Sequence, residues 1–191
     1  MTKKETRFLD KYFKDFKKLI DGNERKKKKL IIIKKILINT RKIKKKILIF
    51  GNGGSASIAS HFSVDLTKNA KIRCINCNEA DLITCFSNDF GYEHWMEKAI
   101  NYFGDKKDIL IVISSSGKSK NMINACIVAR KKKFSKIITL TGHSVNNPIR
   151  KLGDINLWVN SKAYNYIENI HQFWLLSLVD LVIGKTNYLP K

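Results

Sequence analysis

The stretch KILIFGNGGS, residues 46–55, decides the fold, because it joins a short apolar run to a glycine-rich turn and a serine. The run from Ile47 to Phe50 is uninterrupted, as expected of a strand that is buried on both faces of a parallel sheet. The glycines that follow permit positive φ and let backbone N–H groups approach an anion closely. Ser55 begins a segment with helical periodicity, so the turn lies where a helix N-terminus favours negative charge. The stretch predicts a strand, a turn and a helix arranged around an anionic group.

The spacing of this turn matches neither a P-loop nor the G-x-G-x-x-G of dinucleotide-binding folds, so no nucleotide cofactor is expected. An ordinary glycine turn with a serine N-cap is the alternative that requires no ligand. The choice between these interpretations depends on the rest of the chain.

A second loop, residues 114–119 (SSSGKS), follows the apolar run 108–113 and precedes a helical segment at 119–132. Its hydroxyls and backbone amides can surround a phosphate, and Ser119 is expected to cap the helix. Ligands of parallel α/β sheets bind at the carboxyl ends of strands, near helix N-termini. Two loops of this kind favour a phosphate site over two unrelated turns.

Alternating strands and helices predict an α/β fold with three layers, αβα, around a five-stranded parallel sheet. Strands are expected at 46–50, 72–76, 108–113, 136–141 and 154–159, and helices at 5–20, 24–39, 55–68, 93–102, 119–132 and 163–183. We expect one domain over residues 1–191, in which residues 45–191 form the α/β core. Residues 1–44 would form an N-terminal helical extension that packs in an oligomer, although these helices could equally cover the domain's own sheet.

The charge balance is strongly basic: 37 Lys and Arg against 16 Asp and Glu give a net charge of +21. A nucleic-acid or anionic-membrane partner would explain this excess, as would a genome biased toward lysine codons. The excess is spread along the chain, and its densest run, 25–29, lacks the interleaved aromatics that stack on bases, so a nucleic-acid partner is not favoured. A positive field can still attract a phosphorylated substrate.

The cellular location is expected to be the cytoplasm. No apolar run approaches the roughly 20 residues that span a bilayer, and residues 1–18 lack the apolar core of a secretory signal. Cys74 and Cys77 have the C-x-x-C spacing of a zinc knuckle or a redox pair, but two further ligands are not visible nearby. We therefore expect these two, with Cys85 and Cys126, to be reduced thiols, most of them buried.

Five motifs occur in an order and spacing that resembles the phosphoheptose isomerases of the SIS sugar-isomerase superfamily, over roughly residues 5–184. They are the Gly51–Ser55 turn, His61-Phe62, Asn88-Asp89-Phe90-Gly91, the Ser114–Ser119 loop and Ile138-Thr139-Leu140-Thr141-Gly142. The resemblance implies a SIS fold that interconverts sedoheptulose 7-phosphate and D-glycero-D-manno-heptose 7-phosphate, or a related pair. It also implies carbohydrate metabolism toward lipopolysaccharide or capsule heptose, and a homotetramer (or dimer) with active sites between subunits.

Carried over position by position, the resemblance assigns the residues that contact the substrate and its phosphate. They are Asn52, Gly53, Gly54, Ser55, Asn88, Asp89, Ser114, Ser115, Ser116, Ser119 and Glu168. The resemblance further implies a zinc site, in which His61 and Asp65 match a metal-binding His and Glu and Glu168 matches a Gln. His61 and Asp65 are four residues apart and share a helix face, so a simple surface ion pair is the alternative.

Aldose–ketose isomerisation moves a proton between neighbouring carbons through an enediol, which requires an acid–base group. Asp65 matches the family's acid–base position but is one methylene shorter than its Glu. Leu176 occupies the position of the family's catalytic and metal-binding His, and it can do neither job. We assign Asp65, Glu168 and His171 as the catalytic candidates, with a buried polar contact as the alternative role of His171. A SIS protein that binds sugar phosphates without catalysis, like the relatives that associate with the replication initiator DnaA, remains the second hypothesis, and an isomerase for another sugar phosphate the third.

Overall fold

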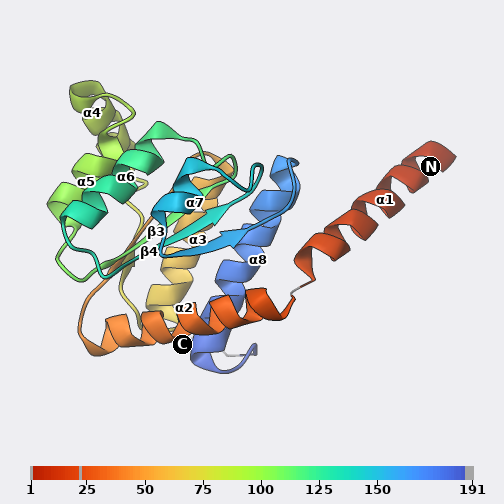
Figure 1. Ribbon diagram of the computed structural model, residues 1–191, viewed down its shortest axis with the longest axis horizontal. Coiled ribbons are helices and arrows are strands. Elements are labelled where there is room, and N and C mark those ends of the chain that lie inside the picture. The colour runs from red at the N-terminus through yellow and green to blue at the C-terminus, as the bar shows by residue number, and fades with distance from the viewer. Residues whose placement is uncertain (1, 22, 188–191) are drawn as a thin grey trace.

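A computed structural model describes residues 2–21 and 23–187 of the chain (Figure 1). In chain order the elements are α1 (Lys3–Ile20), α2 (Glu24–Lys42), β1 (Ile47–Gly51), α3 (Gly54–Lys68), β2 (Cys74–Ile75), α4 (Ala80–Phe90), α5 (Trp95–Phe103), β3 (Ile109–Ser114), α6 (Lys120–Lys131), β4 (Lys136–Thr141), α7 (Pro148–Leu152), β5 (Ile155–Trp158) and α8 (Tyr164–Ile183). The predicted α/β class and the five predicted strands are confirmed. The helices α4 and α7 are additions that the sequence patterns did not indicate.

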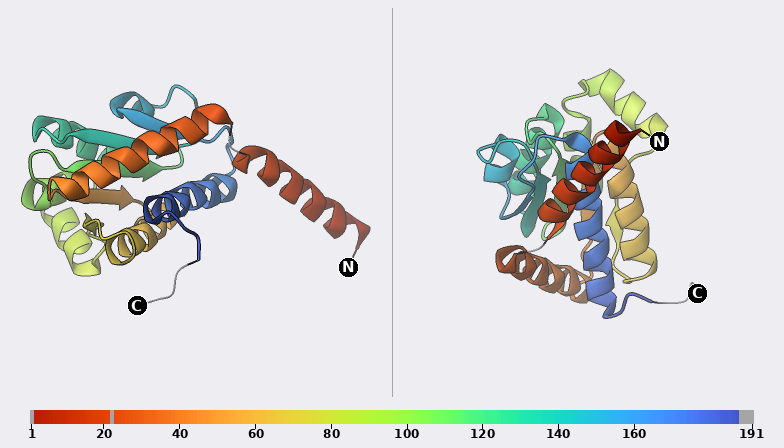
Figure 2. Two further views of the ribbon diagram at one scale, coloured as in Figure 1. Left: turned by 90° about the horizontal axis from the view of Figure 1, so that it is seen from below. Right: turned by 90° about the vertical axis from the view of Figure 1, so that its right-hand side faces the viewer.

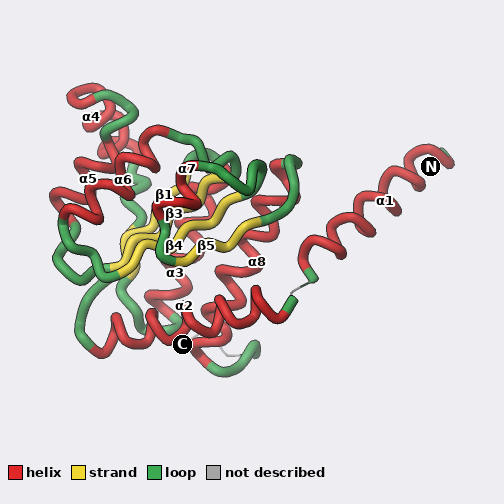
Figure 3. Tube along the Cα trace, viewed as in Figure 1, coloured by secondary structure: helices red, strands yellow, loops and turns green. Residues whose placement is uncertain are grey.

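The five strands form one parallel sheet in the order β2-β1-β3-β4-β5 (Figure 3). The strands β1 and β3 are neighbours, and Gly51 at the end of β1 lies opposite Ile113 near the end of β3. The glycine turn and the serine loop therefore leave the same edge of the sheet side by side. This adjacency brings together two segments that are far apart in the sequence.

The two faces of the sheet carry separate apolar clusters, and β1 shows why. Ile47 and Ile49 join the cluster under α2, α3 and α8, whereas Leu48 and Phe50 join the cluster under α5 and α6. All four side chains are fully buried. Side chains alternate between the faces of a strand, so an uninterrupted apolar run is required when helices cover both faces.

The two N-terminal helices differ in their role. Ile33 and Leu37 of α2 are fully buried in the first cluster, so α2 covers the domain's own sheet. The helix α1 instead extends away from the sheet (Figures 1 and 2) and contributes no buried residue to the described structure. Near its end, Tyr12 and Phe16 pack on Tyr166 of α8.

None of the helices that the structure describes combines the length and apolar character needed to cross a bilayer. The four cysteines are free thiols, and two of them, Cys77 and Cys126, are buried. Burial raises the pKa of each of these two thiols to about 12, which makes them unreactive at neutral pH.

Candidate functional site

A cavity of about 160 Å³ lies between the glycine turn and the serine loop. Its lining consists of polar side chains with one apolar residue: Asn52, Ser55, Ile113, Ser114, Ser115, Ser116, Ser119, Tyr164 and Glu168. Seven of these nine residues were predicted to bind the substrate and its phosphate. The structure thus brings the predicted loop residues together around one space, and Glu168 joins them from α8.

The glycine turn owes its shape to two different constraints. Gly51 approaches the next helix so closely that a Cβ atom there would lie 2.1 Å from the backbone oxygen of Ser55. Gly53 has a φ of 54°, in the region that favours glycine. Together they direct the chain from β1 straight into α3, with Gly53 at the N-cap.

Both helices that start at the cavity, α3 and α6, begin without a capping side chain among the described residues. Ser119 occupies the N-cap position of α6 as predicted, but its hydroxyl makes no capping bond there, which corrects its expected capping role. The first N–H groups of a helix have no intrahelical acceptor and carry partial positive charge. Two uncapped N-termini at one polar cavity favour an anionic ligand.

The hydroxyl groups of the serine loop differ in their hydrogen bonding. Ser114 accepts a hydrogen bond from the Gly117 amide at 3.2 Å, and Ser116 accepts one from the Lys118 amide at 3.3 Å. The buried hydroxyl of Ser115 has no hydrogen-bond partner in the part of the chain that the structure describes. An unpaired buried hydroxyl is costly, so Ser115 is an available donor for a bound ligand.

Glu168 packs against the glycine turn from α8. A Cβ atom built on Gly54 would lie 2.4 Å from the Oε2 atom of Glu168, so the carboxylate fills the space above this glycine. A carboxylate repels a phosphate but accepts hydrogen bonds from hydroxyl groups. Glu168 is therefore positioned for the hydroxyls of a bound sugar rather than for its phosphate.

His61 and Asp65 lie on α3 where it packs on α8. The Nε2 atom of His61 is 3.3 Å from the Asp65 carboxylate, and its Nδ1 atom is 3.3 Å from the side-chain amide of Gln172. No three His, Cys, Asp or Glu side chains among the described residues are close enough to hold a metal ion. The predicted ligand set of His61, Asp65 and Glu168 is therefore corrected: the α8 residue at His61 is Gln172, one turn beyond Glu168. With its carboxamide turned over, Gln172 would present an oxygen, and the set of imidazole, carboxylate and amide oxygen suits zinc.

His171 points away from this site, which corrects its assignment as a catalytic candidate. Its side chain is fully buried, and its Nε2 atom lies 3.2 Å from the backbone oxygen of Thr141. Burial lowers the pKa of His171 to about 4, so the imidazole is neutral at physiological pH. The alternative role, a buried polar contact, is the one that the structure shows.

The buried His171 should make stability fall in acid. Its pKa is about 4 in the folded protein and about 6.5 in the unfolded chain, so the unfolded chain takes up the proton first as pH falls below 6.5. We expect the free energy of unfolding to drop by about 2 kcal/mol between pH 7.5 and pH 5 from this residue. Urea unfolding at both pH values would measure this drop, and His171→Gln should reduce it by the same amount. An unchanged pH dependence in the variant would contradict the assignment.

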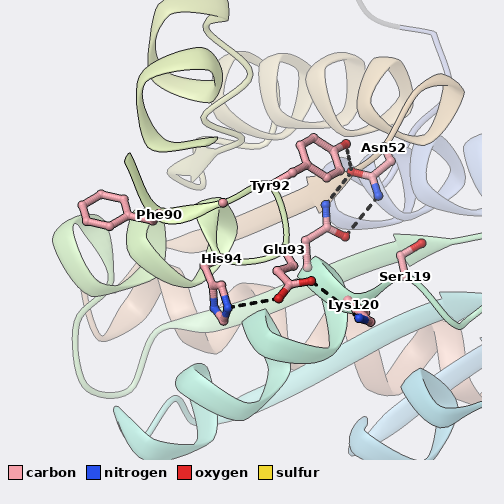
Figure 4. A pocket seen from close by; sticks show the side chains of 9 residues that line it. Asn52, Phe90, Tyr92, Glu93, His94, Ser119 and Lys120 are labelled. Carbon is pink, nitrogen blue, oxygen red and sulfur yellow. Dashed lines mark hydrogen bonds and ion pairs between the residues drawn. The ribbon is translucent and has the colours of Figure 1, made fainter. Parts of the chain in front are cut away.

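A second cavity, of about 540 Å³, adjoins the first through Asn52 and Ser119, which line both. The carboxamides of Asn52 and Asn121 exchange two hydrogen bonds, at 3.0 and 3.2 Å, and the Tyr92 hydroxyl donates to the Asn52 oxygen at 3.1 Å (Figure 4). The Asn52 oxygen is thereby occupied twice, which leaves this carboxamide as a hydrogen-bond donor toward a ligand. The sequence reasoning missed Asn121 and Tyr92; the place of Asn121 in the first turn of a helix after the serine loop was the available signal.

Asn88 and Asp89 are at the exposed C-terminal end of α4, where the Asn88 amide donates to Asp89 at 3.0 Å. Neither residue lines the two cavities that the described residues form here; the adjoining segment from Phe90 to His94 does so instead. The structure therefore does not bring this predicted pair into the site within one chain.

Comparison with known proteins gives a consistent result. A family model described as SIS domain matches residues 11–142. The chain is similar to the phosphoheptose isomerase of Hamiltonella defensa, 36% identical over 71% of this chain and 68% of that protein. It is also similar to the phosphoheptose isomerase of Glaesserella parasuis, 41% identical over 66% of this chain and 68% of that protein.

Solved structures agree with the sequence relatives. A phosphoheptose isomerase from Francisella tularensis superposes with a TM-score of 0.86 at 26% identity, over 97% of this chain and 100% of that one. The phosphoheptose isomerase GmhA from Neisseria gonorrhoeae superposes with a TM-score of 0.85 at 24% identity, over 93% of this chain and 98% of that one, which supports the fold alone.

Proposed function

This chain belongs to the phosphoheptose isomerases of the SIS domain family, and we propose on that basis that it is a phosphosugar isomerase. Its proposed reaction converts sedoheptulose 7-phosphate into D-glycero-D-manno-heptose 7-phosphate, or interconverts a closely related ketose and aldose phosphate. The observation that carries the proposal is the polar cavity between the two loops, where Ser115 offers an unpaired hydroxyl among the described residues.

The phosphate would bind at the serine loop. Ser114, Ser115, Ser116 and Ser119 supply hydroxyls, and the start of α6 supplies free N–H groups. Asn52 would donate its free amide hydrogen to a sugar oxygen, while Glu168 accepts from a sugar hydroxyl. These contacts fix the sugar relative to the catalytic groups, which is the positioning that lowers the barrier of a proton transfer.

Asp65 would carry the proton between the two carbons. It removes the proton from the carbon next to the carbonyl while the carbonyl oxygen takes up a proton, which gives the enediol. It then returns a proton to the former carbonyl carbon while the neighbouring hydroxyl loses its proton and becomes the new carbonyl. His61, 3.3 Å from this carboxylate, holds its orientation. A zinc ion held by His61, Asp65 and Gln172 would stabilise the negative charge that develops on the enediol oxygens.

The apolar side of α1 supports a homotetramer or dimer, which we propose as the working assembly. Phe8, Leu9 and Phe13 are all exposed on this helix, and large exposed apolar surfaces mark contacts between proteins. We place the protein in the cytoplasm, because its cysteines are free and its proposed substrate is a phosphorylated sugar. Its proposed product would be used to make the heptose of lipopolysaccharide or capsule.

Incubation of the purified protein with sedoheptulose 7-phosphate, with and without Zn²⁺, tests the proposal when heptose 7-phosphate is followed by NMR. Product formation supports the isomerase, and a dependence on Zn²⁺ supports the metal. Other ketose phosphates as substrates would detect an isomerase with a different specificity. Substrate binding without turnover of any of them would refute the isomerase and leave a sugar-phosphate-binding protein.

A further inference from the structure

A third cavity, of about 370 Å³, lies where the start of α2 meets the edge strand β5. Five of its eleven lining residues are Lys or Arg, compared with 37 in the 191 residues of the chain, so the local density of cations is more than twice the average. The lining consists of Lys18, Leu19, Asn23, Arg25, Lys26, Lys29, Arg150, Asn156, Leu157, Trp158 and Asn160. Among the described residues it shares no lining with the two cavities of the candidate active site.

Three of the five cations of this cavity donate to backbone oxygens. Lys26 donates to Leu19 at 3.2 Å, and Lys29 donates to Asn156 at 2.6 Å. The guanidinium of Arg150 donates to a backbone oxygen of the preceding loop at 2.6 Å and lies 5.4 Å from the ring centre of Trp158. The positions of these three cations are therefore fixed by the fold, whereas Lys18 and Arg25 are exposed side chains at the edge of the cavity.

Within the described residues, no carboxylate forms an ion pair with these cations. The ion pairs of the described residues include none of the five cations, and no Asp or Glu lines the cavity. Burial lowers the pKa of Lys29, and the charges of Arg25 and Arg150 lower it further. Burial also lowers the pKa of Lys26, against the opposing effect of Asp21. Half-buried cations that repel one another are stabilised by an anion between them.

We infer that this cavity is a second anion site, which binds a compact, multiply charged phosphate compound and is separate from the candidate active site. Its volume suits a small molecule. The start of α2, whose N-cap Asn23 lines the cavity, adds partial positive charge. A nucleic acid is a poorer fit, because Arg150 lies over the Trp158 ring on which a base would stack.

The site connects to the serine loop through the backbone. The Trp158 indole donates to the backbone oxygen of Gly142 at 3.2 Å, and the Gly142 amide donates to the backbone oxygen of Ser115 at 2.9 Å. A ligand in this cavity, which Trp158 lines, is thus two hydrogen bonds from the loop that would hold the sugar phosphate.

Calorimetric titration with inorganic tripolyphosphate tests the inference against the general effect of a basic protein. The double variant Lys26→Gln/Lys29→Gln removes two lining charges, whereas Lys27→Gln/Lys28→Gln removes two exposed charges of the same helix that lie outside the lining. We expect the first variant, the lining pair, to bind tripolyphosphate more weakly by roughly tenfold for each charge removed. The second variant, the control pair, should bind it more weakly by less than about twofold. The single variant Arg25→Gln, at an exposed position, should weaken binding about tenfold without a risk to folding.

Equal weakening in the lining and control pairs would show a diffuse field and overturn the inference, as would the absence of binding to the native protein. The Lys26→Gln/Lys29→Gln variant could also lose more affinity for a single-stranded oligonucleotide than for tripolyphosphate. That result would overturn the inference in favour of a nucleic-acid site. Binding of sedoheptulose 7-phosphate should be unchanged in both pairs. This last measurement separates a failure of the anion site from a failure of the proposed function.

Discussion

Replacing Asp65 by asparagine is expected to lower kcat for sedoheptulose 7-phosphate by about a thousandfold, because the amide cannot accept and return the proton. The KM should change by only a few fold, because the serine loop and Asn52 hold the phosphate and sugar independently of this side chain. Asparagine is nearly the same size as aspartate, so the packing of α3 on α8 should persist. Steady-state kinetics, with a substrate-binding measurement on the same preparation, would determine both parameters.

Asp65→Glu is the matched control for this variant. It keeps the acid–base group and lengthens it by one methylene, to the side chain that the resemblance places at this position in the family. We expect it to keep kcat within about tenfold of the native value. Equal loss of turnover in the two variants would mean that the position matters for its shape, and full activity of Asp65→Asn would remove Asp65 from the mechanism.

Gly51→Ala is expected to be among the most destabilising single substitutions in the chain. The new Cβ atom would lie 2.1 Å from the backbone oxygen and 2.2 Å from the carbonyl carbon of Ser55, and backbone atoms cannot swing aside as a side chain can. Relief of this clash requires β1 and α3 to separate, so we expect a loss of about 4 kcal/mol in the free energy of unfolding. A decrease in Tm of roughly 10 °C should accompany it in a thermal melt.

Gly53→Ala provides the comparison two residues later. A Cβ atom there meets nothing within 4 Å, although the φ of 54° makes alanine unfavourable. This variant should lose about 2 kcal/mol, the cost of a sparsely populated backbone region (φ 54°, ψ −125°) for a non-glycine residue. Similar losses in the two variants would show that backbone conformation, rather than the close approach of strand and helix, constrains this turn.

Elements could be predicted from the sequence where a single local property of the residues determines the structure. The apolar run from Ile47 to Phe50 identified β1 because burial on both faces permits no polar residue. The helix α4 was not predicted, because Glu79 gives it no capping bond among the described residues and its apolar side chains are only partly buried. At the site, both loops were predicted from their residues, since helix N-termini and glycine turns have local causes.

Contacts between distant elements could not be predicted in the same way. His171 and Gln172 both lie near the helix face of Glu168 by spacing, yet one enters the core and the other meets His61. That outcome depends on the rotation of α8 about its own axis relative to α3. The burial of neighbouring apolar side chains such as Trp174 fixes this rotation. The pairing of Asn52 with Asn121 likewise exists only because β1 and β3 are adjacent in the sheet.

The close approach of Gly54 and Glu168 has a consequence for how this sequence can evolve. Any larger residue at position 54 would have to displace the carboxylate, whose Oε2 atom lies 2.4 Å from the Cβ position. Because this atom is the end of a flexible side chain, the carboxylate could rotate aside, but it would then leave the place from which it lines the cavity between the two loops. A substitution at position 54 should therefore change the sugar-binding surface more than the stability of the fold. Relatives with a larger residue at position 54 should therefore differ in how they hold the sugar rather than in whether they fold.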